Sequence, residues 1–273
     1  MKNILFPTDF SPNADHALTF AEEILRHSGA SITLMHIYQL PVIDPNMPVD
    51  ALIEMEKEAK LYAEQKMNSK RDEVQKRHPA LTVSALVQQG LVIDAVTDYA
   101  EKNEVDLIVM GTAGANQLKQ IFMGSNTAAV IDKAHCPVLS VPADAQWKNF
   151  KKLIFAAEFS DSDVPALQML MQFSKSFNSE ITVLHVENLP SESFSEIKNI
   201  EARYRSLVHF SPFQFEVIPG DDVEHTLHEF AANNNADLIC LFRHKRSFWE
   251  RLIHPSLSKR LSYHSHIPML VFH

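Results

Sequence analysis

Residues 105–127 read VDLIVMGTAGANQLKQIFMGSNT, and this stretch decides the fold. An apolar run ends at Met110-Gly111, Gly114 follows, and Gly124-Ser125 comes after nine further residues. Three of the six glycines in the chain lie here, which indicates a backbone that turns tightly or approaches another group closely. The pattern predicts a buried strand, a glycine loop and the first turn of a helix. Free N–H groups and the helix dipole make such an arrangement a favourable place for a phosphate group.

Composition places the chain among soluble globular proteins of one large or two ordinary domains, with 273 residues, 45% apolar and 22% charged. No apolar run approaches the roughly 20 residues of a membrane helix, and the N-terminus reads as a strand instead of a signal peptide. Cys136 and Cys240 lie in apolar runs, which favours buried, reduced thiols over a disulfide or a metal site. A net charge of −9 argues against nucleic acid and gives no support for an anionic membrane as partner. We therefore expect a cytoplasmic protein.

The second half of the chain repeats the first. Four segments of the first half are KNILFPTDFS (2–11), SITLMHI (31–37), VDLIVMG (105–111) and HCPVLSVP (135–142). Their counterparts, in the same order, are KKLIFAAEFS (151–160), EITVLHV (180–186), ADLICLF (236–242) and HIPMLVFH (266–273). A long period of this kind indicates two copies of one domain, which we place at residues 1–143 and 150–273, with a polar boundary between them.

Each copy alternates strands and helices. In the first copy we expect strands near 3–8, 31–37, 81–87, 105–110 and 136–141, and helices near 12–28, 50–77, 91–103 and 124–134. A loop fills residues 38–50, and the second copy shortens this loop and the following helix to about residues 188–208. The predicted fold class is α/β, with two tandem doubly wound domains, each a five-stranded parallel sheet with helices on both faces. Such sheets bind ligands at the carboxyl ends of their strands, where the winding reverses.

The glycine loop, the strand end Pro7-Thr8-Asp9 and the strand Leu34-Met35-His36-Ile37 together resemble the universal stress protein (UspA) family. The resemblance covers nearly the whole chain as a tandem member. The ATP-binding subclass of that family carries the motif G-x2-G-x9-G-[ST], and Gly111, Gly114, Gly124 and Ser125 fit it without a gap. The resemblance implies the strand order 3-2-1-4-5 in each domain.

The resemblance also implies a nucleotide site in the first domain. Pro7, Thr8 and Asp9 would face Met110 and Gly111 across the crevice, with Asp9 and Ile37 near the adenine and ribose. The phosphates would lie over residues 111–114 and at the helix start, which comprises Gly124, Ser125, Asn126 and Thr127. The implied ligand is ATP or another adenine nucleotide. A Mg²⁺ ion bridging the phosphates is compatible with the site, although no cluster of carboxylates marks a metal site built by the protein.

Several of these candidate residues also allow a purely structural interpretation. The glycines could serve only a tight loop, Asp9 could cap the helix that starts near Pro12, and Ile37 could belong to the core. His36 and His185 are interpreted as hydrogen-bonded strand histidines without a catalytic role. His225 and His228 lie three apart on a helix, but no further ligand nearby supports a metal site.

The second copy departs from the motif. Gly111, Gly114 and Gly124 become Phe242, Lys245 and Pro255, Asp9 becomes Glu158, and only Ser256 matches Ser125. Phenylalanine and proline cannot reproduce an open glycine backbone, so we predict that the second domain does not bind ATP in the family manner. The basic and aromatic stretch RHKRSFWER (243–251) could bind another anion, contact a partner or be a solvated loop.

We therefore expect a nucleotide-binding regulatory protein instead of an efficient enzyme, at most a slow ATPase. The second domain would complete an intramolecular pseudo-dimer through the last strands, residues 137–141 and 268–272, and a homodimer is left open. One alternative is an ATP-using ligase or nucleotidyl transferase, which the lack of an SGG-type loop, a HIGH-type histidine pair and a Walker A lysine disfavours. Another is an interaction module with an empty site.

Overall fold

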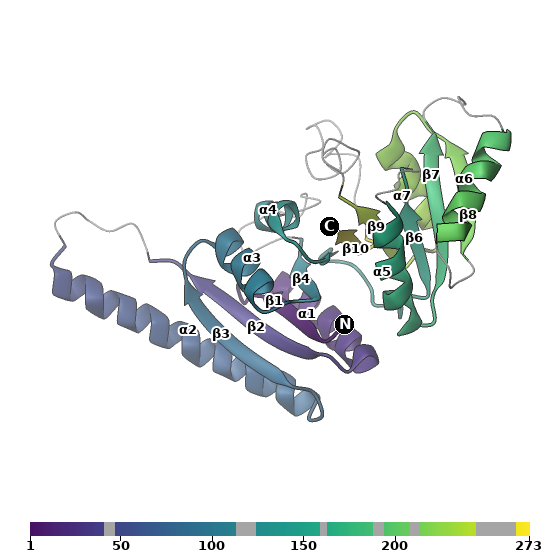
Figure 1. Cartoon of the computed structure of the whole chain (residues 1–273). Coiled ribbons are helices and arrows are strands. Elements are labelled where there is room, and N and C mark those ends of the chain that lie inside the picture. Colours follow the sequence, from purple (N-terminus) through teal and green to yellow (C-terminus); the bar gives the residue numbers. More distant parts are fainter. Residues whose placement is uncertain (41–46, 113–123, 159–162, 188–193, 208–212, 244–265) are drawn as a thin grey trace. The chain divides into compact units, whose positions relative to one another are not determined.

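The computed structural model describes residues 1–40, 47–112, 124–158, 163–187, 194–207, 213–243 and 266–273. In these residues the chain alternates ten strands and seven helices (Figure 1). It divides into two compact units, one containing residues 1–116 and 124–138 and the other the residues from 139 onward. Each unit is described by itself.

The first unit contains the elements that the sequence predicts, with bounds that differ by no more than two residues. They are β1 (Asn3–Pro7), α1 (Pro12–Ser28), β2 (Ser31–Tyr38), α2 (Val49–Arg77), β3 (Val83–Gln89), α3 (Val92–Lys102), β4 (Leu107–Gly111) and α4 (Ser125–Lys133). The next strand, β5 (Val138–Val141), begins at the division between the units. The expected loop at residues 38–50 is slightly shorter, because Tyr38 still belongs to β2 and α2 already starts at Val49.

The strands of the first repeat follow the order β3-β2-β1-β4-β5, which confirms the predicted order 3-2-1-4-5. The ladders from β1 to β2 and β4 are parallel, with Pro7 opposite Met35 and Leu5 opposite Ile108. The Ile108 N–H donates to the carbonyl of Pro137, 2.9 Å away, just before β5. The winding therefore reverses between β1 and β4, where an α/β sheet has its binding crevice.

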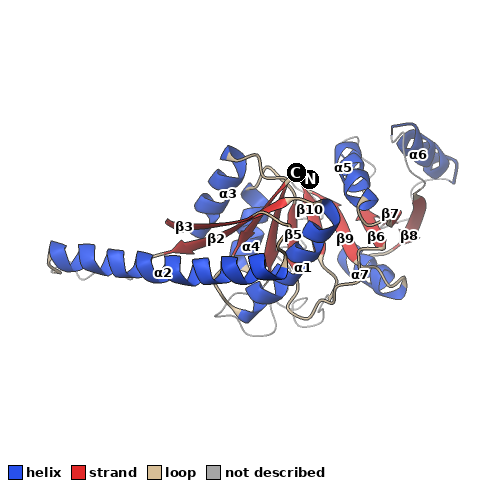
Figure 2. Ribbon diagram, turned by 90° about the horizontal axis from the view of Figure 1, so that it is seen from below, coloured by secondary structure: helices blue, strands red, loops and turns tan. Residues whose placement is uncertain are grey.

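Helices cover both faces of the first sheet: α1 and α2 lie on one face and α3 and α4 on the other (Figure 2). The inner strands β1 and β4 are buried on both sides, as their aliphatic sequences require, whereas the edge strand β3 is partly exposed. Phe6, Leu34 and Val109 are at most 1% exposed, and Phe20 and Ile24 of α1 are buried to the same degree.

The second unit has the same plan. Its elements are β6 (Lys152–Ala156), α5 (Asp163–Lys175), β7 (Glu180–Glu187), α6 (Phe194–Leu207), β8 (Gln214–Pro219), α7 (Val223–Asn233), β9 (Leu238–Phe242) and β10 (Met269–Phe272). The strand order β10-β9-β6-β7-β8 again corresponds to 5-4-1-2-3. Beside β10 lies β5, and the hydroxyl of Ser140 donates to the Met269 carbonyl, 3.2 Å away. The last strands of the two repeats are thus neighbours within this unit.

The repeat extends to backbone conformation and to single hydrogen bonds. Gly29 and its counterpart Asn178 are both left-handed, with φ of 67° and 52°, because the turn into the second strand of each repeat requires it. Asp106 accepts the N–H groups of Lys2 and Asn3 with one carboxylate oxygen, at 2.5 and 2.9 Å. Its counterpart Asp237 does the same for the start of β6, at 2.7 and 3.0 Å. A carboxylate therefore joins the amino ends of strands one and four in each repeat.

The segment before β6 is tied down by aromatic packing. The rings of Trp147 and Phe150 lie 4.5 Å apart, and Phe150 lies 5.4 Å from Phe177 at the end of α5. Asn149 and Phe150 have φ of 60° and 45°, a conformation that costs an L-residue free energy and persists where packing over-determines it. Phe150 is only 1% exposed, so its burial offsets this cost.

Candidate functional site

The winding of the first sheet reverses between β1 and β4, so a binding crevice is expected at the carboxyl ends of these strands, where the sequence places its site. Pro7 and Thr8 are buried, whereas Asp9 is exposed immediately beyond the strand. On the opposite side, Met110 is 7% exposed and Gly111 is half-buried at the end of β4. The ladder between β1 and β4 brings these two groups to one edge of the sheet. Of Pro7, Thr8, Asp9, Met110 and Gly111, only Asp9 has an exposed side chain.

The turn from β1 into α1 is closed by its own side chains. The Phe10 N–H donates to the Thr8 hydroxyl and the Ser11 N–H donates to the Asp9 carboxylate, each at 3.0 Å. The cap of α1 is Ser11, whose hydroxyl accepts the Ala14 N–H at 3.2 Å. The alternative that Asp9 caps the helix is therefore wrong: Ser11 stands closer to the first turn and takes that role. Phe10 has φ of 60°, so the turn holds a strained residue at the crevice.

Packing against α1 requires a glycine at position 111, which the sequence alone did not indicate. A Cβ atom at this position would lie 3.0 Å from the carbonyl oxygen of Asn13 and 3.7 Å from the nitrogen of Ala14. These atoms belong to the first turn of α1, which can approach the end of β4 only because Gly111 has no side chain. The glycine thus brings the positive end of α1 to the crevice, an effect separate from leaving room for a phosphate.

The start of α4 supplies the other edge of the crevice. The N-cap residue is Gly124, which has no side chain to cap this helix. The hydroxyl of Thr127, 3% exposed, donates to the Gly111 carbonyl at 2.8 Å and so fixes α4 against the end of β4. Ser125 and Asn126 are exposed in the first turn. Thr127 is therefore a positioning residue, while Ser125 and Asn126 present their side chains outward.

The strand β2 contributes Ile37, which is half-buried two residues beyond Met35, the partner of Pro7 in the ladder. It is neither a core residue nor fully exposed. Gly114 and the loop around it lie outside the described residues. Of the sequence-predicted residues, the structure thus brings the ends of β1, β2 and β4 and the start of α4 to one edge and leaves Gly114 undescribed.

A cluster that sequence reasoning missed lies beside this turn. The ring of Phe10 is 4.4 Å from that of His36, and the Lys66 ammonium lies 5.5 Å from the Phe10 ring and 4.8 Å from the Tyr62 ring. Nδ1 of His36 is 2.7 Å from the Thr8 carbonyl, and Nδ1 of His185 is 2.8 Å from that of Ala157. The interpretation of both histidines as hydrogen-bonded strand residues is confirmed.

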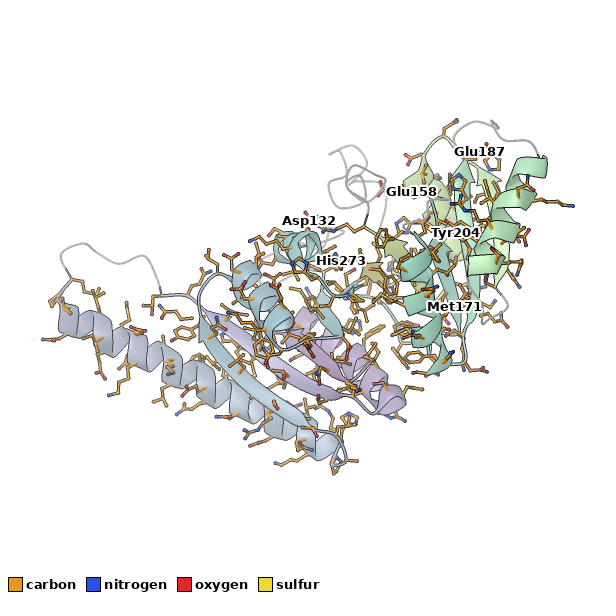
Figure 3. All side chains as sticks on the ribbon, viewed as in Figure 1. Asp132, Glu158, Met171, Glu187, Tyr204 and His273 are labelled. Carbon is orange, nitrogen blue, oxygen red and sulfur yellow. The ribbon has the colours of Figure 1, made fainter. Side chains whose placement is uncertain are left out.

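In the second unit the corresponding edge is built differently. Glu158 follows β6, and its N–H donates to the carboxylate of Asp163, 3.0 Å away (Figure 3). Asp163 is 1% exposed and accepts a second hydrogen bond from the hydroxyl of Tyr204 in α6, at 2.8 Å. Phe242, half-buried at the end of β9, stands where the first repeat has Gly111. Lys245, Pro255 and Ser256 lie outside the described residues, as does most of the basic stretch 243–251.

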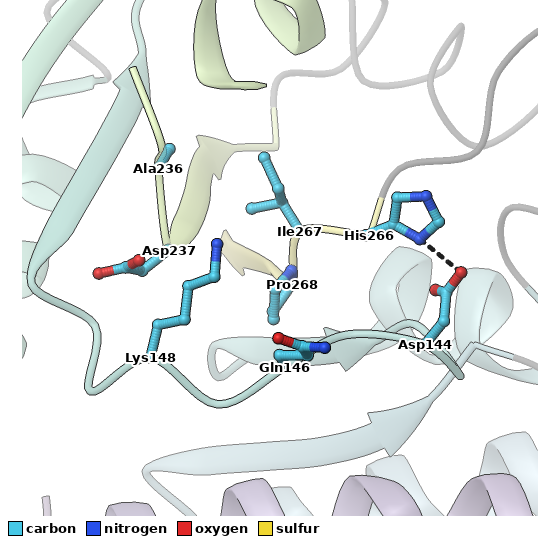
Figure 4. A pocket seen from close by; sticks show the side chains of 8 residues that line it. All are labelled: Asp144, Gln146, Lys148, Ala236, Asp237, His266, Ile267 and Pro268. Carbon is cyan, nitrogen blue, oxygen red and sulfur yellow. Dashed lines mark ion pairs between the residues drawn. The ribbon is translucent and has the colours of Figure 1, made fainter. Parts of the chain in front are cut away.

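A cavity of about 400 Å³ lies at the opposite, amino edge of the second sheet (Figure 4). Asp144 and Lys148 of the inter-repeat segment line it, together with Asp237 before β9 and His266 before β10. Asp144 and His266 form an ion pair, and Asp237 is engaged by the start of β6. The cavity therefore lies at the amino ends of the strands, whereas the sequence predicts a binding crevice at their carboxyl ends.

Two further observations concern the whole described part of the chain. Among these residues, no group of three or more His, Cys, Asp or Glu side chains is arranged to hold a metal ion. His225 is exposed, and burial of His228 lowers its pKa to about 4. In the same residues no helix has both the length and the apolar character needed to cross a membrane.

Comparison with known proteins gives matches to both halves. The model of the "Universal stress protein family" matches residues 1–142 and 149–273. A universal stress protein of Methanocaldococcus jannaschii is 30% identical over 155 residues, which span 51% of this chain and 94% of that protein. One from Thermus aquaticus is 31% identical over 140 residues, 51% of this chain and 98% of the relative.

Similarity to solved structures extends over the full length. The crystal structure of a universal stress protein from Archaeoglobus fulgidus covers 99% of this chain and is itself covered to 95%, with a TM-score of 0.71. At 18% identity this likeness concerns the fold alone. Since the family model matches nearly every residue of the chain in two consecutive copies, the chain belongs to the universal stress protein family, with two such domains in tandem.

Proposed function

We propose that the first domain, residues 1–143, binds ATP or another adenine nucleotide and that the protein regulates a partner through this site. The observation that carries the proposal is the crevice between β1 and β4. It combines the exposed carboxylate of Asp9, the close approach of α1 over Gly111 and the start of α4, whose N-cap residue is a glycine. Two helix N-termini directed at one crevice favour an anionic ligand.

The chemistry of the side chains fits such a ligand. An exposed carboxylate at the end of β1 can accept hydrogen bonds from ribose hydroxyls, and half-buried Ile37 offers an apolar surface for a base. Ser125 and Asn126 are exposed at the start of α4, where hydroxyl, amide and backbone N–H groups can donate to phosphate oxygens. Mg²⁺, where present, would be held chiefly by the phosphates, since the described residues contain no carboxylate cluster for it.

The second domain acts in this proposal as the partner of the first and not as a second nucleotide site. Phe242 occupies the position of Gly111, and a ring there cannot leave the backbone open to a phosphate. The neighbouring strands β5 and β10 support a pseudo-dimer made within one chain. The expected stoichiometry is therefore one nucleotide per chain.

Equilibrium binding of labelled ATP to the wild type and to Gly114→Lys tests the site. The wild type should bind one equivalent, and a lysine side chain in the loop should weaken binding by roughly tenfold or more, because each lost 1.4 kcal/mol corresponds to a factor of ten. Equal affinities would reject the assigned loop. Denaturing the purified protein and identifying any released nucleotide by mass spectrometry distinguishes ATP from AMP or another adenine nucleotide.

A further inference from the structure

The helix α2 is much longer than the sheet it covers. Its 29 residues extend about 43 Å at 1.5 Å per residue, whereas the eight residues of β2 extend about 26 Å. The buried side chains of α2 are those of Ala63, Met67 and Val74, all in its C-terminal part. The N-terminal part projects beyond the carboxyl ends of β2 and β3 (Figures 1 and 2). In the second repeat the corresponding helix, α6, has only 14 residues, so the fold itself does not require the projection.

The projecting part has an apolar face. Leu52, Met55, Ala59 and Tyr62 recur at spacings of three and four residues, which places them on one side of the helix. Tyr62 is 59% exposed, and Val49, in the first turn of α2, is 69% exposed. Leu52, Met55 and Ala59 are half-buried. None of the four side chains in this stripe belongs to the buried core of the described residues, and an apolar surface of this kind commonly marks an interaction site.

The charges beside the stripe indicate what it binds. Glu56 and Glu58 lie on opposite sides of it, each about 80° from its centre at 100° per residue. In the described residues neither forms an ion pair, whereas Lys57 and Lys60 are already within 4.0 and 3.9 Å of Glu54 and Glu64. Paired helices choose their partners through these flanking charges. A second copy of α2 in antiparallel pairing would place glutamate against glutamate, so a helix with flanking lysine or arginine fits better.

We propose that the face of α2 formed by Leu52, Met55, Ala59 and Tyr62 docks a basic amphipathic helix of a partner protein. The stripe supplies the apolar contact, and Glu56 and Glu58 supply the charge that selects the partner. The surface lies at the same edge of the first sheet as the proposed nucleotide crevice, but helix docking does not depend on ATP binding and is tested without nucleotide.

The test uses the full chain and a synthetic helical peptide of about 20 residues, with leucines at the stripe positions and lysines beside them. Fluorescence anisotropy should show saturable binding. The double variant Glu56→Lys/Glu58→Lys and the variant Met55→Asp should each weaken binding by roughly tenfold or more. A matched control, Glu101→Lys/Glu104→Lys, makes the same change in net charge at exposed residues outside α2 and should bind as the wild type does.

A reciprocal peptide with glutamates beside its leucines sharpens the test. It should bind the Glu56→Lys/Glu58→Lys variant better than the wild type, which excludes loss of folding as the cause of weakened binding. Equal weakening in the control variant would mean attraction by net charge alone and would overturn the proposal. So would the absence of binding, or self-association of the chain that Met55→Asp abolishes, since the occupant would then be a second copy.

Discussion

In each repeat a turn follows the first strand, and the two turns are closed by different hydrogen bonds. In the first repeat the turn is closed over residues 8–11 by Thr8, Asp9 and Ser11, and Asp9 stays exposed at the crevice. In the second, Asp163 is buried and accepts the N–H of Glu158 and the hydroxyl of Tyr204. Both sheets have the same strand order. The fold therefore tolerates either closure. Glu158, the counterpart of Asp9, is also exposed, so the feature specific to the first repeat is Gly111 at the end of its fourth strand, where the second repeat has Phe242.

The largest expected effect comes from exchanging Gly111 and Phe242. Gly111→Phe places a ring against the first turn of α1, where even a Cβ would lie 3.0 Å from the Asn13 carbonyl oxygen. We expect loss of ATP binding by roughly a hundredfold or more and destabilisation of about 3 kcal/mol from overpacking. Calorimetric titration and urea unfolding measure the two effects. The reverse change, Phe242→Gly, should create no second site, and two ATP molecules bound per chain in that variant would contradict the contrast drawn between the repeats.

The next-largest effect is a pH dependence of stability that comes from His228 in α7. This buried histidine corresponds to Thr97, which is buried in α3. Burial lowers the pKa of folded His228 to about 4 from an ordinary value of 6.5. The unfolded chain therefore binds a proton between these values and the folded chain does not, so stability is full above pH 6.5 and falls as the pH is lowered toward 4. The expected loss is about 3 kcal/mol.

Replacing His228 with the residue of the first repeat tests this. His228→Thr should remove most of the acid-dependent loss in urea unfolding followed from pH 7 to pH 4. His225→Gln, at the neighbouring exposed histidine, serves as the control and should keep most of it, because burial lowers the pKa of His228 more than the charge of His225 does. An unchanged pH profile in His228→Thr would show that other groups cause the acid sensitivity.

A smaller effect is expected where the repeats differ in a buried polar contact. Glu22 in α1 is 7% exposed, and its carboxylate accepts a hydrogen bond from Arg77 at 2.5 Å. It also lies 3.1 Å from Nε2 of His78. These contacts join α1 to the end of α2. Hydrogen bonding to Glu22 raises the pKa of the Arg77 guanidinium. The second repeat has Met171 at this place, 4% exposed and apolar.

Glu22→Met should cost about 2 kcal/mol of unfolding free energy, because it leaves Arg77 and His78 facing a group that accepts no hydrogen bond. The double variant Glu22→Met/Arg77→Met should recover part of this loss. Urea denaturation of both variants measures the difference. A double variant less stable than the single one would show that Arg77 contributes independently of Glu22.

The smallest effect is expected at Thr127. Thr127→Val keeps the shape of the side chain but removes the hydrogen bond to the Gly111 carbonyl, at a cost of about 1 kcal/mol. Since this bond positions α4 at the crevice, ATP affinity should fall a few-fold, whereas Ser125→Ala should leave stability unchanged. Unaltered stability in Thr127→Val would indicate that packing alone fixes the start of α4.

Periodicity and repetition in the sequence were sufficient to predict the strands and helices, and the resemblance to the universal stress protein family supplied the strand order. The strands and helices depend on local patterns, such as the apolar strand before Gly111. The same patterns occur twice in the same order, so each copy supports the assignment of strands and helices in the other. The crevice between β1 and β4 follows from the order alone. Gly111 was singled out from the sequence as a phosphate-site residue, which stays a prediction, but its close approach to Asn13 was not foreseen, because residues almost a hundred positions apart meet only in the folded chain.

What the sequence by itself determined is therefore the fold, the repeat and the location of the motif that only the first copy retains. The tertiary structure alone decided that Ser11 and not Asp9 caps α1, that the Thr127 hydroxyl donates to the Gly111 carbonyl, and that Asp163 accepts hydrogen bonds from Glu158 and Tyr204 in the second repeat. It also showed that α2 continues past its sheet. The physical reason is the same in each case: residue type sets which groups can donate, accept or pack, but only the three-dimensional arrangement determines which partners come within reach.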